Sequence, residues 1–128
     1  MSFEVGVVAQ FTASHHLVGD FGPASLAHSH AYRVEVGVSG DRLRVDGTLF
    51  DISRLQGAVA AVLADLDGSD LNALGLADLA APNPTAEVVA RLFFDRVAPA
   101  LSGAGLARLQ TRVWESPEAY AGYSGDLN

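Results

Sequence analysis

Two stretches near the start of the chain alternate between apolar and polar positions, which is the pattern of a β-strand with one buried face. The first covers residues 3–15, and the second covers residues 28–39. Histidines continue the apolar parity at the end of the first stretch and at the start of the second. Residues 16–27 between them contain two glycines and a proline, so we expect a loop there.

The residues that follow predict a further strand and a helix. Residues 42–52, RLRVDGTLFDI, come after the turn signal SGDR and are predicted to form a returning strand, broken by the Asp-Gly pair within it. Apolar residues then recur every three or four positions up to Leu66, which predicts an amphipathic helix. Either Asp51 or Ser53 is placed to cap the first turn of this helix.

A second helix and two more strands complete the pattern. Residues 67–84 are rich in loop-forming residues, and a new apolar stripe begins after Thr85. The sequence SGAG at 102–105 ends that helix, and strands are predicted over residues 106–116 and 119–124. The main elements therefore follow the order ββααββ.

This order indicates an α+β fold in which two helices cover one face of an antiparallel sheet. Neither a repeat nor a linker divides the sequence, so residues 1–128 are expected to form a single domain. A four-stranded sheet has two open edges, which proteins usually cover or pair. Pairing the edges between subunits is one solution, so we expect an oligomer.

Composition and charge exclude several classes of function. The formal net charge is −7 and the isoelectric point is near 4.8, which argues against nucleic acid and against a membrane surface as partners. The absence of cysteine excludes disulfides, thiolate zinc sites and a cysteine nucleophile. The first residues do not resemble a signal peptide, and no apolar run approaches the roughly 18 residues of a membrane span. A cytoplasmic location is therefore expected.

All four histidines of the chain lie within a stretch of sixteen residues. His28 and His30 are two positions apart on a predicted strand and project from the same face, and His15 ends the other strand on its apolar parity. Three neutral imidazoles and one open position form the ligand set of a catalytic zinc site. Alternatively, one or two of them are core or loop histidines that only make hydrogen bonds. His16 has the opposite parity and is expected to face solvent.

Glu115 is a second candidate, because a carboxylate is unexpected where it stands. It shares the parity of Leu109 and Val113, which is the apolar face of the predicted strand. Burying an unpaired charge is costly, so this carboxylate needs a binding partner. A local arginine or a backbone N–H group could supply one.

Several motifs resemble those of the 6-pyruvoyl-tetrahydropterin synthase family, which includes the 6-carboxy-tetrahydropterin synthases. The segments FTASH and HSHAY resemble the family pattern FSASH…HGHNY. Four later segments resemble further family motifs in the same order over most of the chain: TLFDISRL, LADLDGSDLN, APNPTAEVVARLF and RVWESPEAYAGY. Five separate motifs in register make this resemblance specific.

The resemblance implies a tunnelling fold (T-fold), in which three subunits join their sheets into a barrel and two trimers stack as a hexamer. Active sites would lie between subunits. It implies that zinc is held by His15, His28 and His30, and that Glu115 accepts hydrogen bonds from the N–H groups of a pterin ring. Thr85 would contact the same ring from a neighbouring subunit, and a plain helix-capping role is equally open for it.

Two departures from the family pattern affect the expected chemistry. The general-base cysteine of the family corresponds to Ala24, and the histidine of its Asp-His pair corresponds to Gly68, which leaves Asp67 as the remaining catalytic residue. Ser25 stands beside the first position, but a serine without an adjacent base is a poor proton acceptor.

The expected function follows from what is retained and what is missing. We expect a homologue that binds a pterin-like (2-amino-4-oxo-pyrimidine) ligand and does not run the synthase reaction. The alternative is a zinc-dependent lyase or aldolase that acts on a dihydropterin side chain with a different acid or base. A purely structural hexamer is a third class, and only the open sheet edges support it.

Overall fold

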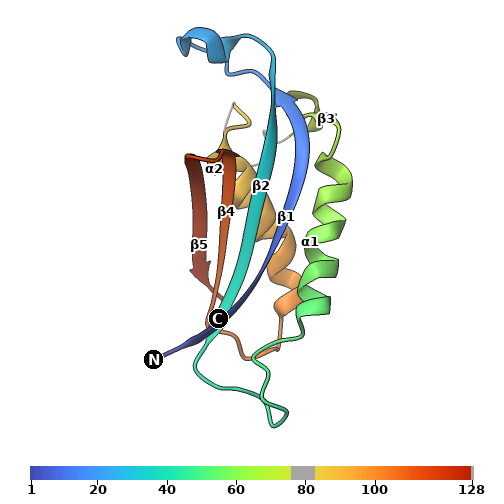
Figure 1. Ribbon diagram of the computed structural model, residues 1–128, viewed down its shortest axis with the longest axis vertical. Coiled ribbons are helices and arrows are strands. Elements are labelled where there is room, and N and C mark those ends of the chain that lie inside the picture. Colours follow the sequence, from blue (N-terminus) through green and yellow to red (C-terminus); the bar gives the residue numbers. More distant parts are fainter. Residues whose placement is uncertain (76–82, 128) are drawn as a thin grey trace.

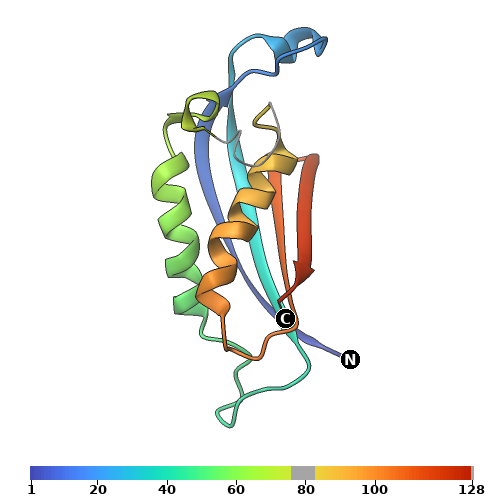
Figure 2. The same ribbon diagram turned by 180° about the vertical axis from the view of Figure 1, so that it is seen from behind.

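The computed structural model describes residues 1–75 and 83–127, and these form one mixed sheet covered on one face by two helices (Figures 1 and 2). The strand order across the sheet is β3-β1-β2-β4-β5. The strands are β1 (Phe3–His15), β2 (His28–Gly40), β3 (Ser69–Asp70), β4 (Arg108–Ser116) and β5 (Ala119–Asp126). The helices are α1 (Ile52–Leu66) and α2 (Ala86–Val97), with short 3-10 turns at Gly22–Ser25, Leu71–Leu74 and Ala98–Leu101.

The two N-terminal strands pair as the alternation predicts. β1 and β2 are antiparallel without interruption, from Phe3 opposite Gly40 to His15 opposite His28. Alternate residues of β2 from Tyr32 to Val38 are almost completely buried and face the helices. Their polar neighbours lie on the other face of the sheet, which no element of the described chain covers.

The core lies between the sheet and the two helices. The ring of Phe11 stacks on Tyr32 with centroids 4.8 Å apart and packs against Phe93 of α2 at 6.0 Å. Both helices bury one side at intervals of three or four residues, as the apolar stripes predict. The residues buried on these stripes are Leu55, Val59, Val62, Leu66, Ala86, Val89, Ala90, Phe93 and Val97.

Each helix begins with a side-chain cap. The carboxylate of Asp51 accepts a hydrogen bond from the backbone N–H of Ser53 at 2.9 Å, so Asp51 is the capping residue of α1. The hydroxyl of Thr85 accepts one from the N–H of Val88 at 3.2 Å and caps α2. Both bonds satisfy backbone donors that a helix leaves free in its first turn.

The returning strand predicted over residues 42–52 is wrong. Both sides of β2 are already paired, with β1 on one side and β4 on the other, so no position beside β2 remains for it. The segment instead closes on itself: Arg44 and Thr48 share a backbone hydrogen bond of 2.8 Å, and Asp46 accepts two from Thr48. Gly47 has φ of +89°, a conformation that suits glycine in a turn.

The sheet is mixed rather than purely antiparallel, which is the second correction. Within the loop predicted over residues 67–84, β3 pairs in parallel with the end of β1. The N–H of Gly68 donates to the carbonyl of Thr12 at 2.7 Å beside this pairing. Residues 76–82 of the same predicted loop lie outside the described part of the chain.

The edges of the sheet are relevant to association between subunits, and the helices to whether the chain can cross a membrane. Among the residues that the structure describes, β5 forms one edge, and most of β1 has no strand on its outer side, because β3 pairs only with Ala13 and Ser14. Within residues 1–75 and 83–127, neither helix has the length and apolar character needed to cross a bilayer.

The buried hydroxyl of Thr111 yields the first prediction. It lies within reach of two carbonyl oxygens, that of Ala90 in α2 at 2.7 Å and that of Tyr123 in β5 at 3.0 Å. Thr111→Val keeps the shape and removes the donor, so the free energy of unfolding should fall by about 1 kcal/mol. Urea unfolding at fixed protein concentration measures this change.

The matched control for this measurement is Thr12→Val, because Thr12 is exposed and lies on a strand of the same sheet. Its stability should stay within about 0.5 kcal/mol of the wild type. An unchanged unfolding midpoint for Thr111→Val would show that the hydroxyl does not stabilise the contact between α2 and the sheet.

Candidate metal and ligand site

The pairing of β1 with β2 brings three histidines together at one end of the sheet. His15 is directly opposite His28, and His30 is opposite Ala13. One ring nitrogen of each histidine lies within 4.8 Å of the others, so the three can hold a metal ion. Nitrogens around a tetrahedral zinc are about 3.4 Å apart, so small ring rotations would bring the triad to ligand geometry.

Backbone carbonyls hold one ring nitrogen of two of these histidines. Nδ1 of His15 lies 2.8 Å from the carbonyl of Pro84, and Nδ1 of His28 lies 2.7 Å from the carbonyl of Leu26. Because a carbonyl can only accept, these two Nδ1 atoms carry the proton and each Nε2 keeps its lone pair. His30 lies beside the backbone and the charge of Glu115. This arrangement is typical of metal-binding histidines.

Burial also keeps His30 neutral. Desolvation lowers the pKa of His30 most strongly, and the neighbouring His15 and His28 lower it further. The charge of Glu115 acts in the opposite direction without reversing the shift. A neutral imidazole is the form that binds metal, so His30 is prepared as a ligand at neutral pH.

Tyr32 closes the site on the side of the core. Its side chain is 1% exposed, and burial together with the charge of Glu115 raises its pKa. The hydroxyl lies 3.5 Å from Nδ1 of His15, but that nitrogen already donates to Pro84. Tyr32 therefore remains a protonated, packed side chain rather than a proton acceptor.

Glu115 lies at an irregularity of β4. The pairing of β4 with β5 shifts by one residue between Trp114 and Ser116, which leaves Glu115 as the extra residue of a β-bulge. Its side chain is half-buried, and its charge acts on both His30 and Tyr32. In the described part of the chain no ion pair or hydrogen bond engages its carboxylate, so the local partner that the sequence left open is not found.

Thr85 is joined to the histidines through its neighbour in the chain. Pro84, which holds His15, directly precedes Thr85 at the start of α2. The Thr85 hydroxyl accepts from Val88, which matches the capping interpretation, and its own hydrogen stays free to donate. The structure thus shows the cap and leaves room for a second contact.

Asp67 has a structural contact that the sequence did not indicate. Its carboxylate accepts a hydrogen bond of 2.9 Å from the backbone N–H of Thr12. The next residue, Gly68, donates to the carbonyl of the same Thr12 and has φ of +75°. Asp67 thereby fixes the end of α1 to β1, and none of its hydrogen bonds in the described chain reaches a histidine.

The hydroxyl of Ser25 is likewise engaged in hydrogen bonds. Its hydroxyl donates to the carbonyl of Gly19 at 2.8 Å and accepts from the N–H of Phe21 at 3.4 Å. These bonds hold the short turn Gly22–Ser25 that precedes β2. Neither Ser25 nor the adjacent Ala24 offers a base to the triad.

Two asparagines hold the loop beside the triad, and the sequence analysis missed them. The amide of Asn72 bonds both backbone groups of His16, at 2.9 and 3.0 Å, and the amide of Asn83 does the same for Val18, at 2.8 and 3.1 Å. Each amide therefore makes with one loop residue the pair of backbone hydrogen bonds that a neighbouring strand would make. Each asparagine lies in a predicted loop, and no local pattern in the sequence indicates a contact more than fifty residues away.

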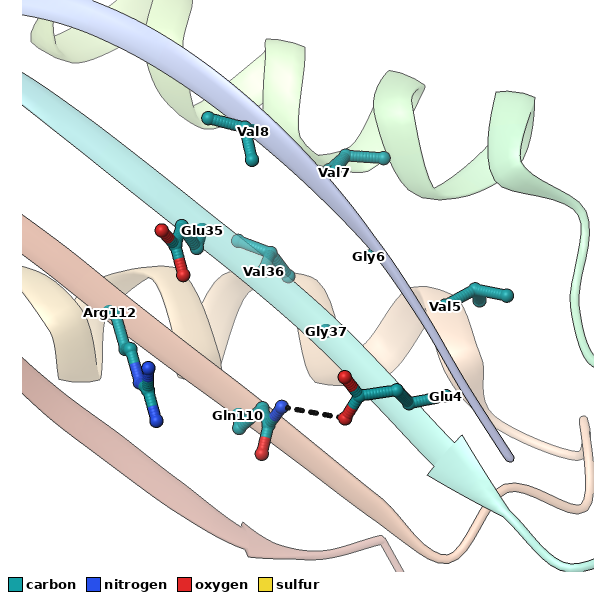
Figure 3. Close-up of a pocket in the computed structure, with 10 residues that line it drawn as sticks. All are labelled: Glu4, Val5, Gly6, Val7, Val8, Glu35, Val36, Gly37, Gln110 and Arg112. Atoms are coloured by element: carbon teal, nitrogen blue, oxygen red, sulfur yellow. Dashed lines mark hydrogen bonds between the residues drawn. The ribbon is translucent and has the colours of Figure 1, made fainter. Parts of the chain in front are cut away.

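A shallow pocket on the opposite face of the sheet is not part of this site. Figure 3 shows that it crosses β1, β2 and β4. Its volume is about 450 Å³. Glu4 and Gln110 meet across it at 3.4 Å, over Gly37. No histidine lines it, so the cluster of metal-binding groups and this pocket are separate features.

Comparison with known proteins agrees with this description. A family model described as 6-pyruvoyl tetrahydropterin synthase matches residues 4–126, and the chain belongs to this family. A Pyrococcus horikoshii protein named "Putative 6-carboxy-5,6,7,8-tetrahydropterin synthase" is 28% identical, over 88% of this chain and 83% of its own.

Solved structures show the same fold. The 6-pyruvoyl tetrahydropterin synthase of Caenorhabditis elegans superposes with a TM-score of 0.81 at 22% identity, covering 98% of this chain and 96% of its own. The enzyme of Plasmodium falciparum gives 0.79 at 20% identity, covering 98% of each chain. The predicted α+β fold with two helices on one face of the sheet is confirmed.

The histidine cluster yields the second prediction. Purified protein should retain about one zinc ion per chain, and His30→Ala should weaken zinc binding by more than roughly 100-fold because it removes a ligand. Elemental analysis and competition with a chelator measure both quantities. His16→Ala is the matched control, since His16 adjoins the triad and is not one of its members; equal losses in both variants would contradict the assignment.

Proposed function

We propose that this protein binds a pterin-like ligand beside a zinc ion and does not catalyse the 6-pyruvoyl-tetrahydropterin synthase reaction. The observation that carries the proposal is the position of Glu115, half-buried next to a triad in which His15 and His28 are held by backbone carbonyls. In this proposal His15, His28 and His30 hold zinc. Zinc would supply a Lewis acid that polarises an oxygen of the ligand.

Glu115 is the proposed anchor for the ring. A carboxylate can accept two parallel hydrogen bonds, and a 2-amino-4-oxo-pyrimidine presents a ring N–H and an exocyclic amine side by side. The carboxylate is partly desolvated and lacks a bond to any described residue, so a ligand of this kind would satisfy it. This accounts for a charge on an otherwise apolar face.

Thr85 is the proposed second contact, supplied by a neighbouring subunit. Its hydroxyl keeps a free hydrogen at the partly buried start of α2, and the sheet has two edges at which another copy could pair. We propose that three copies close a barrel and that two barrels stack as a homohexamer. The acidic chain would act in the cytoplasm, without nucleic acid or membrane as a partner.

The proposed loss of the synthase reaction depends on proton transfer. Ala24 and Gly68 carry no titratable group, and Ser25 is already hydrogen-bonded within its loop. Asp67 is the one member of the relay that remains, and its carboxylate is engaged by Thr12. Losing one acid or base costs on the order of 10²–10⁴ in rate, so losing two should leave very little turnover.

The second candidate is a zinc-dependent lyase or aldolase acting on a dihydropterin side chain. The retained triad favours it, because a ligand set with an open position suits catalysis as well as binding. In the Plasmodium vivax synthase a glutamate is described as a catalytic residue, which supports a different acid or base within the family. To act as that acid or base, Asp67 would have to give up its hydrogen bond with the backbone of Thr12.

The third prediction tests the anchor. Glu115→Gln keeps the shape and removes the charge, so affinity for neopterin should fall by roughly 10- to 100-fold, as expected for hydrogen bonds to a charged group. Calorimetry measures the affinity, and gel filtration verifies that assembly is intact. Glu118→Gln, an exposed position three residues further on, is the control; unchanged binding in Glu115→Gln would refute the anchor.

The fourth prediction tests the missing base. Incubation of the zinc-loaded protein with dihydroneopterin triphosphate should give no detectable 6-pyruvoyl-tetrahydropterin, since neither proton-transfer group of the family is present. Product analysis by chromatography measures this. Robust turnover would show that another residue has taken over the role of the cysteine. The hypothesis of a zinc-dependent lyase would then be preferred.

A further inference from the structure

Carboxylates dominate the charge around the end of the sheet that carries the histidine triad. They come from several elements, and all except Glu115 are exposed to solvent. They are Asp20 in the loop before β2, Asp67 and Asp70 beside the end of β1, Glu87 in the first turn of α2, and Glu115 and Glu118 around the turn from β4 to β5. A ligand therefore reaches the triad through a region of negative charge.

Most of the positive charges lie elsewhere in the chain. The sequence contains no lysine, so eight arginines are its only strongly basic side chains. β2 has 13 residues, and at about 3.3 Å per residue its two ends are about 40 Å apart. Six arginines lie away from the triad (Figure 1): Arg42 and Arg44 after β2, Arg54 at the start of α1, Arg96 in the last turn of α2, Arg108 at the start of β4 and Arg112 in its middle.

The other two arginines are nearer to the triad, and each has a carboxylate partner of its own. Arg91 of α2 pairs with Asp95 at 3.6 Å, and Arg33 of β2 pairs with Glu35 at 3.1 Å. Arg33 is three positions after His30 on the strand and therefore projects from the opposite face of the sheet. Neither side chain is placed to pair with an anion at the triad.

The contact proposed from a neighbouring subunit adds no free cation. Thr85 would bring with it the first turn of α2, where the charged residue is Glu87. The partial positive charge of a helix N-terminus can bind phosphate. Here Glu87 offsets part of that charge, and the hydroxyl of Thr85 already accepts from the N–H of Val88.

Apolar side chains border the triad on the side of the loop between β1 and β2. Val18, Phe21 and Leu26 are 64%, 49% and 72% exposed. The loop is held against the site, because the carbonyl of Leu26 lies 2.7 Å from Nδ1 of His28 and the amide of Asn83 bonds the backbone of Val18. It thus presents apolar surface where a chain of phosphates would need donors and cations.

These charges and surfaces restrict the side chain of the ligand. Phosphate groups in proteins are held by arginine, lysine and free backbone N–H groups, because each phosphate brings negative charge that must be paired. We infer that the ligand of this site is a pterin whose side chain carries no phosphate. This inference rests on the proposed binding of a pterin at Glu115 and narrows the class of ligand. The zinc ion would be the nearest cation, and Glu115 offsets part of its charge.

The test compares neopterin with neopterin triphosphate by calorimetry on the full-length protein. A zinc buffer fixes the free zinc concentration, so that the triphosphate does not empty the metal site. The triphosphate should bind at least fivefold more weakly than neopterin. A smaller difference, or tighter binding of the triphosphate, would overturn the inference and leave the proposed pterin binding intact. Failure of neopterin itself to bind would refute the proposed function, and the inference with it.

The effect of salt on these affinities has an expected sign. Added sodium chloride screens charges, so repulsion by the carboxylates predicts that the affinity for the triphosphate rises towards that for neopterin. If ion pairs held the phosphates, the same salt would lower the affinity for the triphosphate. Such a fall would contradict the inference.

Charge-reversal variants locate the repulsion. Glu118→Lys and Asp20→Lys should each raise the affinity for the triphosphate at least twofold and leave that for neopterin within twofold. Asp41→Lys makes the same change of charge at an exposed position at the opposite end of β2, so it is the matched control. Equal gains in all three variants, or no gain in the first two, would show that the local carboxylates do not exclude phosphate.

Arg33→Gln examines the arginine nearest to His30 along β2. Because Arg33 pairs with Glu35 on the open face, the affinity for the triphosphate should stay within twofold of the wild type. A larger loss would reveal a phosphate contact from this side chain and overturn the inference.

Discussion

The register in which β1 pairs with β2 is the constraint on which the candidate site depends. It sets His15 opposite His28, and His30 two residues further along the same face. A shift of one residue would turn every side chain of a strand to the other face, taking the histidines out of reach of one another and the valines out of the core. Packing of the apolar face therefore fixes the geometry of the triad, and no separate device is needed to align it.

Contacts from distant parts of the chain then prepare the three rings. Pro84 comes from the start of α2, Leu26 from the loop before β2, and Glu115 from the bulge in β4. Pro84 and Leu26 each supply a backbone carbonyl to one histidine, and Glu115 lies beside the third. The site is therefore complete only when the helix and all these strands are in place. Folding and the readiness of the site are thus one event, in keeping with a ligand set that cannot preform in the unfolded chain.

Features with a local pattern were predictable, and features created by competition between segments were not. Alternation identified β1, β2 and the partial burial of Glu115, and capping residues identified the starts of both helices. The segment 42–52 has strand-like composition, but β4 takes the position beside β2 that a hairpin would need. The asparagine contacts and the carboxylate of Asp67 on Thr12 join segments far apart in sequence, and nothing in the neighbouring residues encodes them.

The identity of the residue after Asn83 has a consequence for the chemical ageing of the protein. Asparagine loses its amide mainly when the following backbone nitrogen attacks the side-chain carbonyl, and proline has no N–H with which to do so. Asn83 precedes Pro84, so the amide that clamps Val18 beside the histidines is protected from this reaction. Asn72 precedes an alanine and lacks that protection, so the two clamps on the same loop should age at different rates.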